Sequence, residues 1–164
     1  MDYKIAKVME PRTSRPQLRL ETIRELTENG IPAGIIIGPV IPGLTDQEIP
    51  KIIEEGVKAG AKVARYIMLR LPHTTKSIFE DWLQKYFPAR KEKILNRIKS
   101  VRGGKLYDSA FFKRDRGDGF FADQIENLFN ITCRKAGIFE KRFTLSTQNF
   151  KKHISSQIDL FEQR

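Results

Sequence analysis

A strand, a helix and a second strand follow one another over residues 34–71, and this order constrains the fold more than any other feature of the chain. The apolar run at residues 35–37 predicts the first strand, and the β-branched and aromatic run at residues 63–68 predicts the second. Between them, apolar residues recur at helical spacing, namely Ile49, Ile52, Ile53 and Val57. Two strands joined by a helix in this way form a right-handed parallel crossover.

The predicted helix carries a start signal and a stop signal. Thr45 followed three residues later by Glu48 is the pattern of a capping box, in which each side chain bonds the other residue's backbone N–H. Gly60 terminates the helix, because glycine adopts the left-handed conformation that commonly follows a last turn.

The rest of the chain predicts helices rather than further strands. Residues 5–9 and 16–29 read as helices, the second with Leu18, Ile23 and Leu26 facing inward and Gly30 as its stop. The pattern after Pro72 is again helical. Parallel strands need both faces covered and neighbouring strands on either side. We therefore expect an α/β fold, as a fragment of a barrel or an open sheet with a helical C-terminal region.

Several short motifs in this framework resemble one known family. They are Glu10-Pro11-Arg12, Gly30-Ile31-Pro32, the run from Pro39 to Asp46, Leu69-Arg70-Leu71-Pro72 and Arg102-Gly103-Gly104. Together they resemble the C-terminal part of radical S-adenosylmethionine (SAM) proteins of the spore photoproduct lyase-like branch, also called DNA repair photolyases. The resemblance implies that residues 1–72 are the C-terminal portion of a partial (β/α) barrel. Residues 73–146 would then be a basic helical extension and residues 147–164 a flexible tail.

The same resemblance implies a cofactor chemistry that this chain cannot complete alone. Family members carry a Cys-x3-Cys-x2-Cys loop that holds a [4Fe–4S] cluster, with one iron left open for SAM. This sequence contains one cysteine, Cys133, in a predicted downstream helix. We therefore expect no cofactor on this chain alone and no catalysis by it. The chain would either pair with a separately encoded cluster-bearing N-terminal chain or be left over from a split gene.

The resemblance also assigns residues to the SAM site. The ends of the two strands would present apolar side chains and backbone groups to the adenine, and Glu10 with Arg12 would meet the methionine portion. The residues implied are Glu10, Arg12, Gly38, Val40, Ile41, Leu69 and Arg70. Without the family, Gly38 reads as a turn glycine and the Glu10/Arg12 pair as a surface salt bridge.

Positive charge is concentrated in the downstream part of the chain. Residues 1–60 hold 8 Lys and Arg against 9 Asp and Glu, whereas residues 61–164 hold 22 against 11. Cations with interleaved aromatics suit a phosphate backbone and unstacked bases. The residues predicted to contact nucleic acid are Lys99, Arg102, Lys105, Arg114 and Arg116. The alternative is a solvated helix face, because Ile94, Leu95 and Ile98 recur among these cations at core spacing.

Composition predicts a cytoplasmic protein without a membrane segment or a resident metal. No apolar run approaches the ~20 residues of a membrane span. The first residues lack the basic start and apolar core of a signal peptide. His73 and His153 stand apart from any ligand spacing typical of a metal site.

The end of the chain carries a separate signal. Residues 157–161, Gln-Ile-Asp-Leu-Phe, resemble the pentapeptide with which bacterial polymerases and repair proteins dock on the DNA sliding clamp. Leu160 and Phe161 would fill an apolar pocket, and Gln157 would bond at its rim. The alternative is that this pair packs on the chain's own helices.

Two function classes follow from these observations. The first is the C-terminal part of a radical SAM enzyme that acts on DNA or on another substrate. The second is a basic module without a cofactor that brings DNA and the sliding clamp together. A reading frame immediately upstream that encodes Cys-x3-Cys-x2-Cys would favour the first.

A peptide of residues 155–164 tests the clamp motif. We expect it to bind the bacterial sliding clamp in the micromolar range, about −8 kcal/mol, because a short segment gives up part of its binding energy on becoming ordered. The double change Leu160→Ala and Phe161→Ala should abolish binding, and Gln157→Ala should weaken it by about 1 to 2 kcal/mol. Fluorescence anisotropy measures this, and equal binding by the double variant would disprove the motif.

Overall fold

A computed structural model of the protein describes residues 3–107 and 115–138. Six α-helices and two strands occur in these ranges. Two short 3-10 turns, η1 (Asp46–Glu48) and η2 (Pro88–Arg90), accompany them. In chain order they are α1 (Tyr3–Met9), α2 (Pro16–Glu28), β1 (Gly34–Val40), α3 (Ile49–Lys58), β2 (Val63–Met68), α4 (Thr75–Tyr86), α5 (Lys91–Ser100) and α6 (Phe120–Lys135).

The predicted βαβ unit is confirmed. Strands β1 and β2 pair in parallel, with Ile35 opposite Ala64 and Ile37 opposite Tyr66, and α3 makes the crossover between them. The pairing continues past the strand ends, where the Leu69 N–H donates to the Val40 carbonyl at 2.9 Å. The carboxyl ends of both strands therefore lie side by side.

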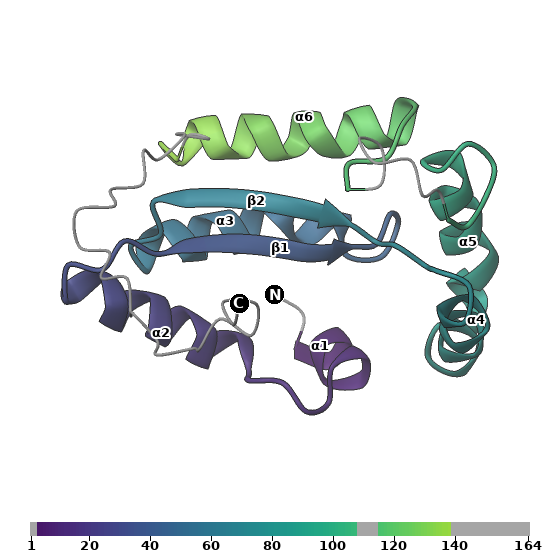
Figure 1. Ribbon diagram of the computed structural model, residues 1–164, viewed down its shortest axis with the longest axis horizontal. Coiled ribbons are helices and arrows are strands. Elements are labelled where there is room, and N and C mark those ends of the chain that lie inside the picture. Colours follow the sequence, from purple (N-terminus) through teal and green to yellow (C-terminus); the bar gives the residue numbers. More distant parts are fainter. Residues whose placement is uncertain (1–2, 108–114, 139–164) are drawn as a thin grey trace, which may run out of the picture.

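One face of the sheet is covered and the other is open. Helices α3 and α6 pack over the covered face, and α6 runs beside β2 (Figure 1). The Tyr66 and Phe129 rings meet there with 4.9 Å between their centroids. On the opposite face, the side chains of Ile36 and Ile67 are 68% and 38% exposed.

A second apolar core lies beyond the carboxyl ends of the strands, where α4 and α5 are placed (Figure 1). Its buried members are Ile41, Leu44, Leu69, Leu71, Leu83, Ile94, Leu95 and Ile98. Ile5 and Met9 of α1 pack against it, and the indole N–H of Trp82 donates to the Val8 carbonyl at 3.0 Å. This core therefore holds α1 in place through α4.

The expected boundary at residue 72 does not separate two independent cores. Ile125, Phe129 and Cys133 of α6 share one buried cluster with Ile37 of β1 and Ile53 of α3. Because α6 supplies one wall of the core that covers the sheet, residues 120–138 belong to the same folding unit as the βαβ crossover.

Two local predictions are wrong. The Thr45 hydroxyl accepts from the Ile41 N–H at 2.8 Å, and α3 begins only at Ile49 without a side-chain cap, so there is no capping box. Thr45 instead ties the loop after β1. Leu18 is 51% exposed rather than inward. Leu20 takes the inward direction, and residues two apart on a helix point to different sides.

Tyr66 carries a buried hydroxyl with no hydrogen-bond partner among the described residues. Burial raises the pKa of Tyr66 to about 12, and the nearby Glu126 carboxylate adds to this shift while Arg116 opposes it. The phenol is therefore held in its neutral form in the folded protein well above the usual pH of its ionisation.

We expect the Tyr66 contribution to stability to be constant below about pH 10 and to fall by about 1.4 kcal/mol per pH unit from there to about pH 12, since only the unfolded chain ionises in that window. Tyr66→Phe should remove this part of the pH dependence and change stability at pH 7 by about 1 kcal/mol or less. Urea denaturation of both proteins at several pH values measures the difference. Parallel pH profiles would contradict the prediction.

Candidate functional site

A groove runs along the outer side of β1 in the described part of the chain. We call it the α1–α2–β1 groove, and its volume is about 450 Å³. In Figure 1, α2 runs along β1 on the side away from β2, and α1 lies toward the carboxyl end of that strand. The lining comes from α1 (Ile5, Ala6, Met9), from Glu10, from α2 (Pro16, Arg19, Leu20, Thr22, Ile23), from residues 34–39 of β1 and from Thr45, Glu48 and Ile52.

The groove is mostly apolar because two sequence patterns converge on it. Side chains alternate between the faces of β1, so Ile35 and Ile37 point toward the helices and Ile36 toward the open face. Leu20 and Ile23 form the inward stripe of α2. This lining suits an apolar occupant with few polar groups.

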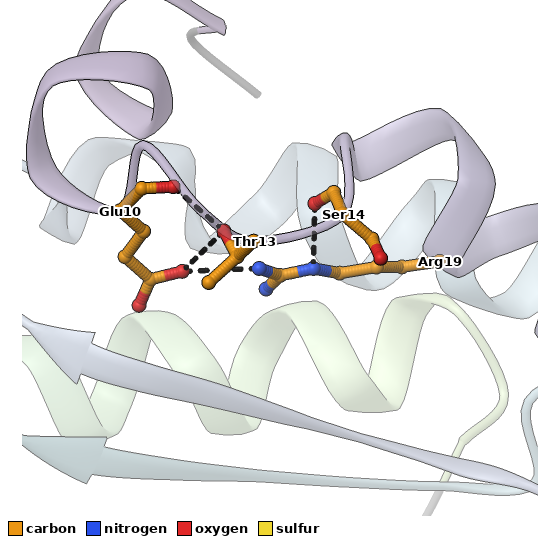
Figure 2. A network of polar contacts seen from close by, with 4 residues as sticks. All are labelled: Glu10, Thr13, Ser14 and Arg19. Carbon is orange, nitrogen blue, oxygen red and sulfur yellow. Dashed lines mark hydrogen bonds and ion pairs between the residues drawn. The ribbon is translucent and has the colours of Figure 1, made fainter.

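Figure 2 shows a polar network around Glu10 and Arg19, which both line the groove. A guanidinium N–H of Arg19 donates to the Glu10 carboxylate at 3.0 Å, and the Arg19 Nε–H donates to the Ser14 carbonyl at 3.0 Å. The Thr13 hydroxyl donates to the Glu10 carbonyl at 2.9 Å. These bonds tie the loop of residues 10–15 to the first turn of α2.

The Glu10–Arg19 pair fixes the shape of the loop more than it adds stability. The two side chains are 37% and 53% exposed, and pairs of this kind contribute about 1 kcal/mol or less. The sequence prediction placed Glu10 beside Arg12, but Arg12 lies exposed outside the network. Arg19 was missed, because nothing in its spacing shows that the loop folds back onto α2.

The seven residues predicted to bind SAM do not form one site. Glu10 and Gly38 line the α1–α2–β1 groove. Val40 and Ile41 are fully buried in the two cores, and Leu69 is 8% exposed, so their side chains cannot face an adenine. The strand ends turn these apolar side chains toward α3, α4 and α5 rather than toward the open face, so the implied contacts with adenine would fall to backbone groups.

Arg70 also has a structural partner. Its guanidinium lies 3.3 Å from the Asp115 carboxylate, and the Asp115 carbonyl accepts from the Met68 N–H at 2.8 Å. The segment that begins at Asp115 therefore covers the end of β2. On these grounds the described residues do not fit SAM by themselves.

The described residues offer no group of three His, Cys, Asp or Glu side chains arranged to hold a metal ion. Cys133 is a single thiol buried in the core between α6 and the sheet. The donors present here do not fit a [4Fe–4S] cluster, which needs three thiolates.

The predicted nucleic-acid contacts divide into accessible and inaccessible side chains. Lys105 is exposed and Lys99 is partly exposed at the end of α5. Arg102 is 2% exposed and donates to the Leu69 carbonyl at 2.8 Å, so its predicted contact with nucleic acid is wrong. Arg116 is exposed but pairs with the Glu126 carboxylate at 3.0 Å. Arg114 and the clamp-motif residues Gln157, Leu160 and Phe161 lie outside the described residues.

Other arginines that the sequence left unassigned stabilise the fold. The Arg97 guanidinium lies over the Phe121 ring, 4.3 Å from its centroid, and joins α5 to α6. A guanidinium N–H of Arg90 donates to the Gly43 carbonyl at 2.6 Å. Neither contact has a local sequence signal, because each partner is more than twenty residues away.

No helix in the described ranges is long and apolar enough to cross a membrane.

Comparison with known proteins gives one partial similarity. No family model matches the chain, and no solved structure matches it. A protein of the Acidianus two-tailed virus, described as uncharacterized protein ORF301, is 34% identical over 58 residues. That stretch is 35% of this chain and 17% of the viral protein, so the similarity covers a minor part of its relative. It carries no information on activity.

The accessible lysines provide a test of nucleic-acid contact. We expect affinity for DNA to fall steeply with added salt and to show little sequence preference. Replacing Lys99 and Lys105 together by Ala should lower the slope of log K against log salt by about two, because each lysine neutralises one phosphate. Arg102→Ala is the matched control. Because Arg102 is buried, its replacement should leave the slope unchanged and instead reduce thermal stability by removing the bond to the Leu69 carbonyl. Titration of a labelled DNA oligonucleotide measures the slope, and an unchanged slope would assign these lysines to a solvated face.

Proposed function

We propose that the chain is the C-terminal part of a radical SAM enzyme of the spore photoproduct lyase-like branch, acting on DNA or on another substrate in the cytoplasm. In this proposal the chain performs no chemistry alone. It supplies the framework of a partial barrel, and a separate cluster-bearing polypeptide supplies the [4Fe–4S] cluster and the greater part of the SAM site.

The observation that best supports this proposal is the incomplete sheet. Two parallel strands with a crossover helix form a stable domain only with further strands beside them, because parallel sheets are covered on both faces. Here one face is open at Ile36 and Ile67, and the outer side of β1 borders a groove. A framework of this kind suits a chain that works in an assembly.

A second candidate function is a basic module that binds DNA and the sliding clamp without a cofactor. The observation in its favour is the pair of accessible lysines, Lys99 and Lys105, beside the Gly103-Gly104 turn that follows α5. This candidate requires neither SAM nor a second chain, so the two proposals differ in what the purified protein does alone.

Anaerobic reconstitution with iron and sulfide separates them. We expect the isolated chain to show no iron–sulfur absorbance band and to release no 5′-deoxyadenosine from SAM, because one buried thiol cannot replace three thiolates. Addition of a polypeptide that carries Cys-x3-Cys-x2-Cys, encoded next to this chain, should restore both signals. SAM cleavage by the chain alone, or none with such a polypeptide present, would contradict the proposal.

A further inference from the structure

The two edges of the sheet are not equivalent. At β2, the Asp115 carbonyl accepts from the Met68 N–H, and α6 packs beside the strand. At β1, no described residue pairs with the outer edge, and the α1–α2–β1 groove runs along it. Among the described residues, the outer edge of β1 is therefore the more accessible of the two edges.

The backbone groups that face this edge can be assigned. The Ala33 carbonyl accepts from the Lys62 N–H at 2.9 Å, on the β2 side. Because the backbone groups of successive residues in a strand alternate between its two edges, Ile35 and Ile37 also face β2. Gly34 and Ile36, which precede the register shift after Ile37, then direct their N–H and C=O groups outward, so the groove presents unpaired strand groups beside an apolar wall.

We propose that this edge binds a β-strand from a separate polypeptide, which pairs with β1 in parallel and places alternate apolar side chains in the α1–α2–β1 groove. A flat apolar ligand would fill the groove but leave the outward backbone groups unpaired. A strand satisfies both. The parallel direction follows from α2, which leads into β1 from the position of a crossover helix and would cover a parallel neighbour.

Charge fixes the chemistry of this partner further. Residues 3–24, which supply α1, the loop and most of α2, carry six cations and two carboxylates. Since α2 runs opposite to β1, this basic segment lies toward the carboxyl end of β1 (Figure 1). The acidic residues Glu25 and Glu28 lie at the other end of α2. A parallel strand with acidic residues after its C-terminal end matches this distribution.

A second copy of this chain fits less well. Two β1 edges related by a two-fold axis pair in antiparallel fashion, and both copies then place α1 and α2 over the same face of the joined sheet. Each copy would then bring its own α1 and α2 to the joined edge, where the α1–α2–β1 groove has a volume of about 450 Å³.

The proposal rests on the proposed function in one respect, the need for a second polypeptide, and its test needs neither SAM nor a cluster. The probe is a fluorescein-labelled peptide, Val-Thr-Val-Thr-Val-Thr-Val-Glu-Glu, titrated with the full chain. We expect saturable binding with a dissociation constant on the order of tens of micromolar, because a short peptide must become ordered. The reversed peptide, with the two Glu at its N-terminal end, should bind at least fivefold more weakly.

Variants of Ile36 test the strand pairing directly. Ile36→Pro removes an outward N–H and leaves the β2 side unchanged, and proline is tolerated on edge strands. It should weaken peptide binding at least tenfold. Ile36→Val, which keeps the N–H and the shape of the strand, should bind within twofold of the parent. A probe peptide methylated at alternate backbone nitrogens should show the same loss of binding when it is titrated with the parent protein.

Equal binding by the Ile36→Pro and Ile36→Val proteins, with their melting curves unchanged, would overturn the proposal. A dimer in sedimentation velocity that Ile36→Pro converts to a monomer would also overturn it, by identifying a second copy as the occupant. Peptide binding without 5′-deoxyadenosine formation in the reconstituted pair would leave this docking site standing and refute the radical SAM function. Formation of 5′-deoxyadenosine in the reconstituted pair without peptide binding would place the partner at another surface of the chain, away from the α1–α2–β1 groove.

Discussion

The parallel pairing of β1 with β2 is the interaction on which the rest of the structure depends. It joins the carboxyl ends of the strands at Val40 and Leu69, and both cores are built from the residues on either side of that point. A parallel pair cannot close on itself as a hairpin does, so it always has two edges and two faces to cover. Here α3 and α6 cover one face, and the segment from Asp115 covers the end of one edge.

The high positive charge of the chain has a partly structural role. Arg102 reaches the Leu69 carbonyl inside the second core, Arg97 lies on the Phe121 ring, and Arg90 bonds the loop after β1. The planar guanidinium with several donors suits such positions, where it satisfies backbone carbonyls between elements. In the part of the downstream basic region that the structure describes, Lys105 is exposed and Lys99 partly exposed, so their charge is available to a polyanion. A count of Lys and Arg therefore overstates the charge available for recognition.

The βαβ unit follows from the sequence, because its signals are local. Periodicity at residues 49–57 and the apolar runs around it identify each element without reference to the rest of the chain. The site residues do not follow in the same way. Val40 and Ile41 read as strand-end residues near a ligand, but whether they face a groove or a core depends on where α4 and α5 pack. Arg19 and Arg102 act through partners nine and thirty-three residues away.

Apolar packing and polar bonds together hold the walls of the α1–α2–β1 groove. The Trp82 bond to the Val8 carbonyl and the apolar packing of Ile5 and Met9 hold α1, and the exposed Glu10–Arg19 pair holds the loop to α2. An exposed pair of this kind costs little to break. The loop is thus held to α2 less firmly than β1 is held by its pairing with β2. A strand edge held more firmly than the loop beside it suits an extended segment, because hydrogen bonds set the register and the wall accommodates the side chains.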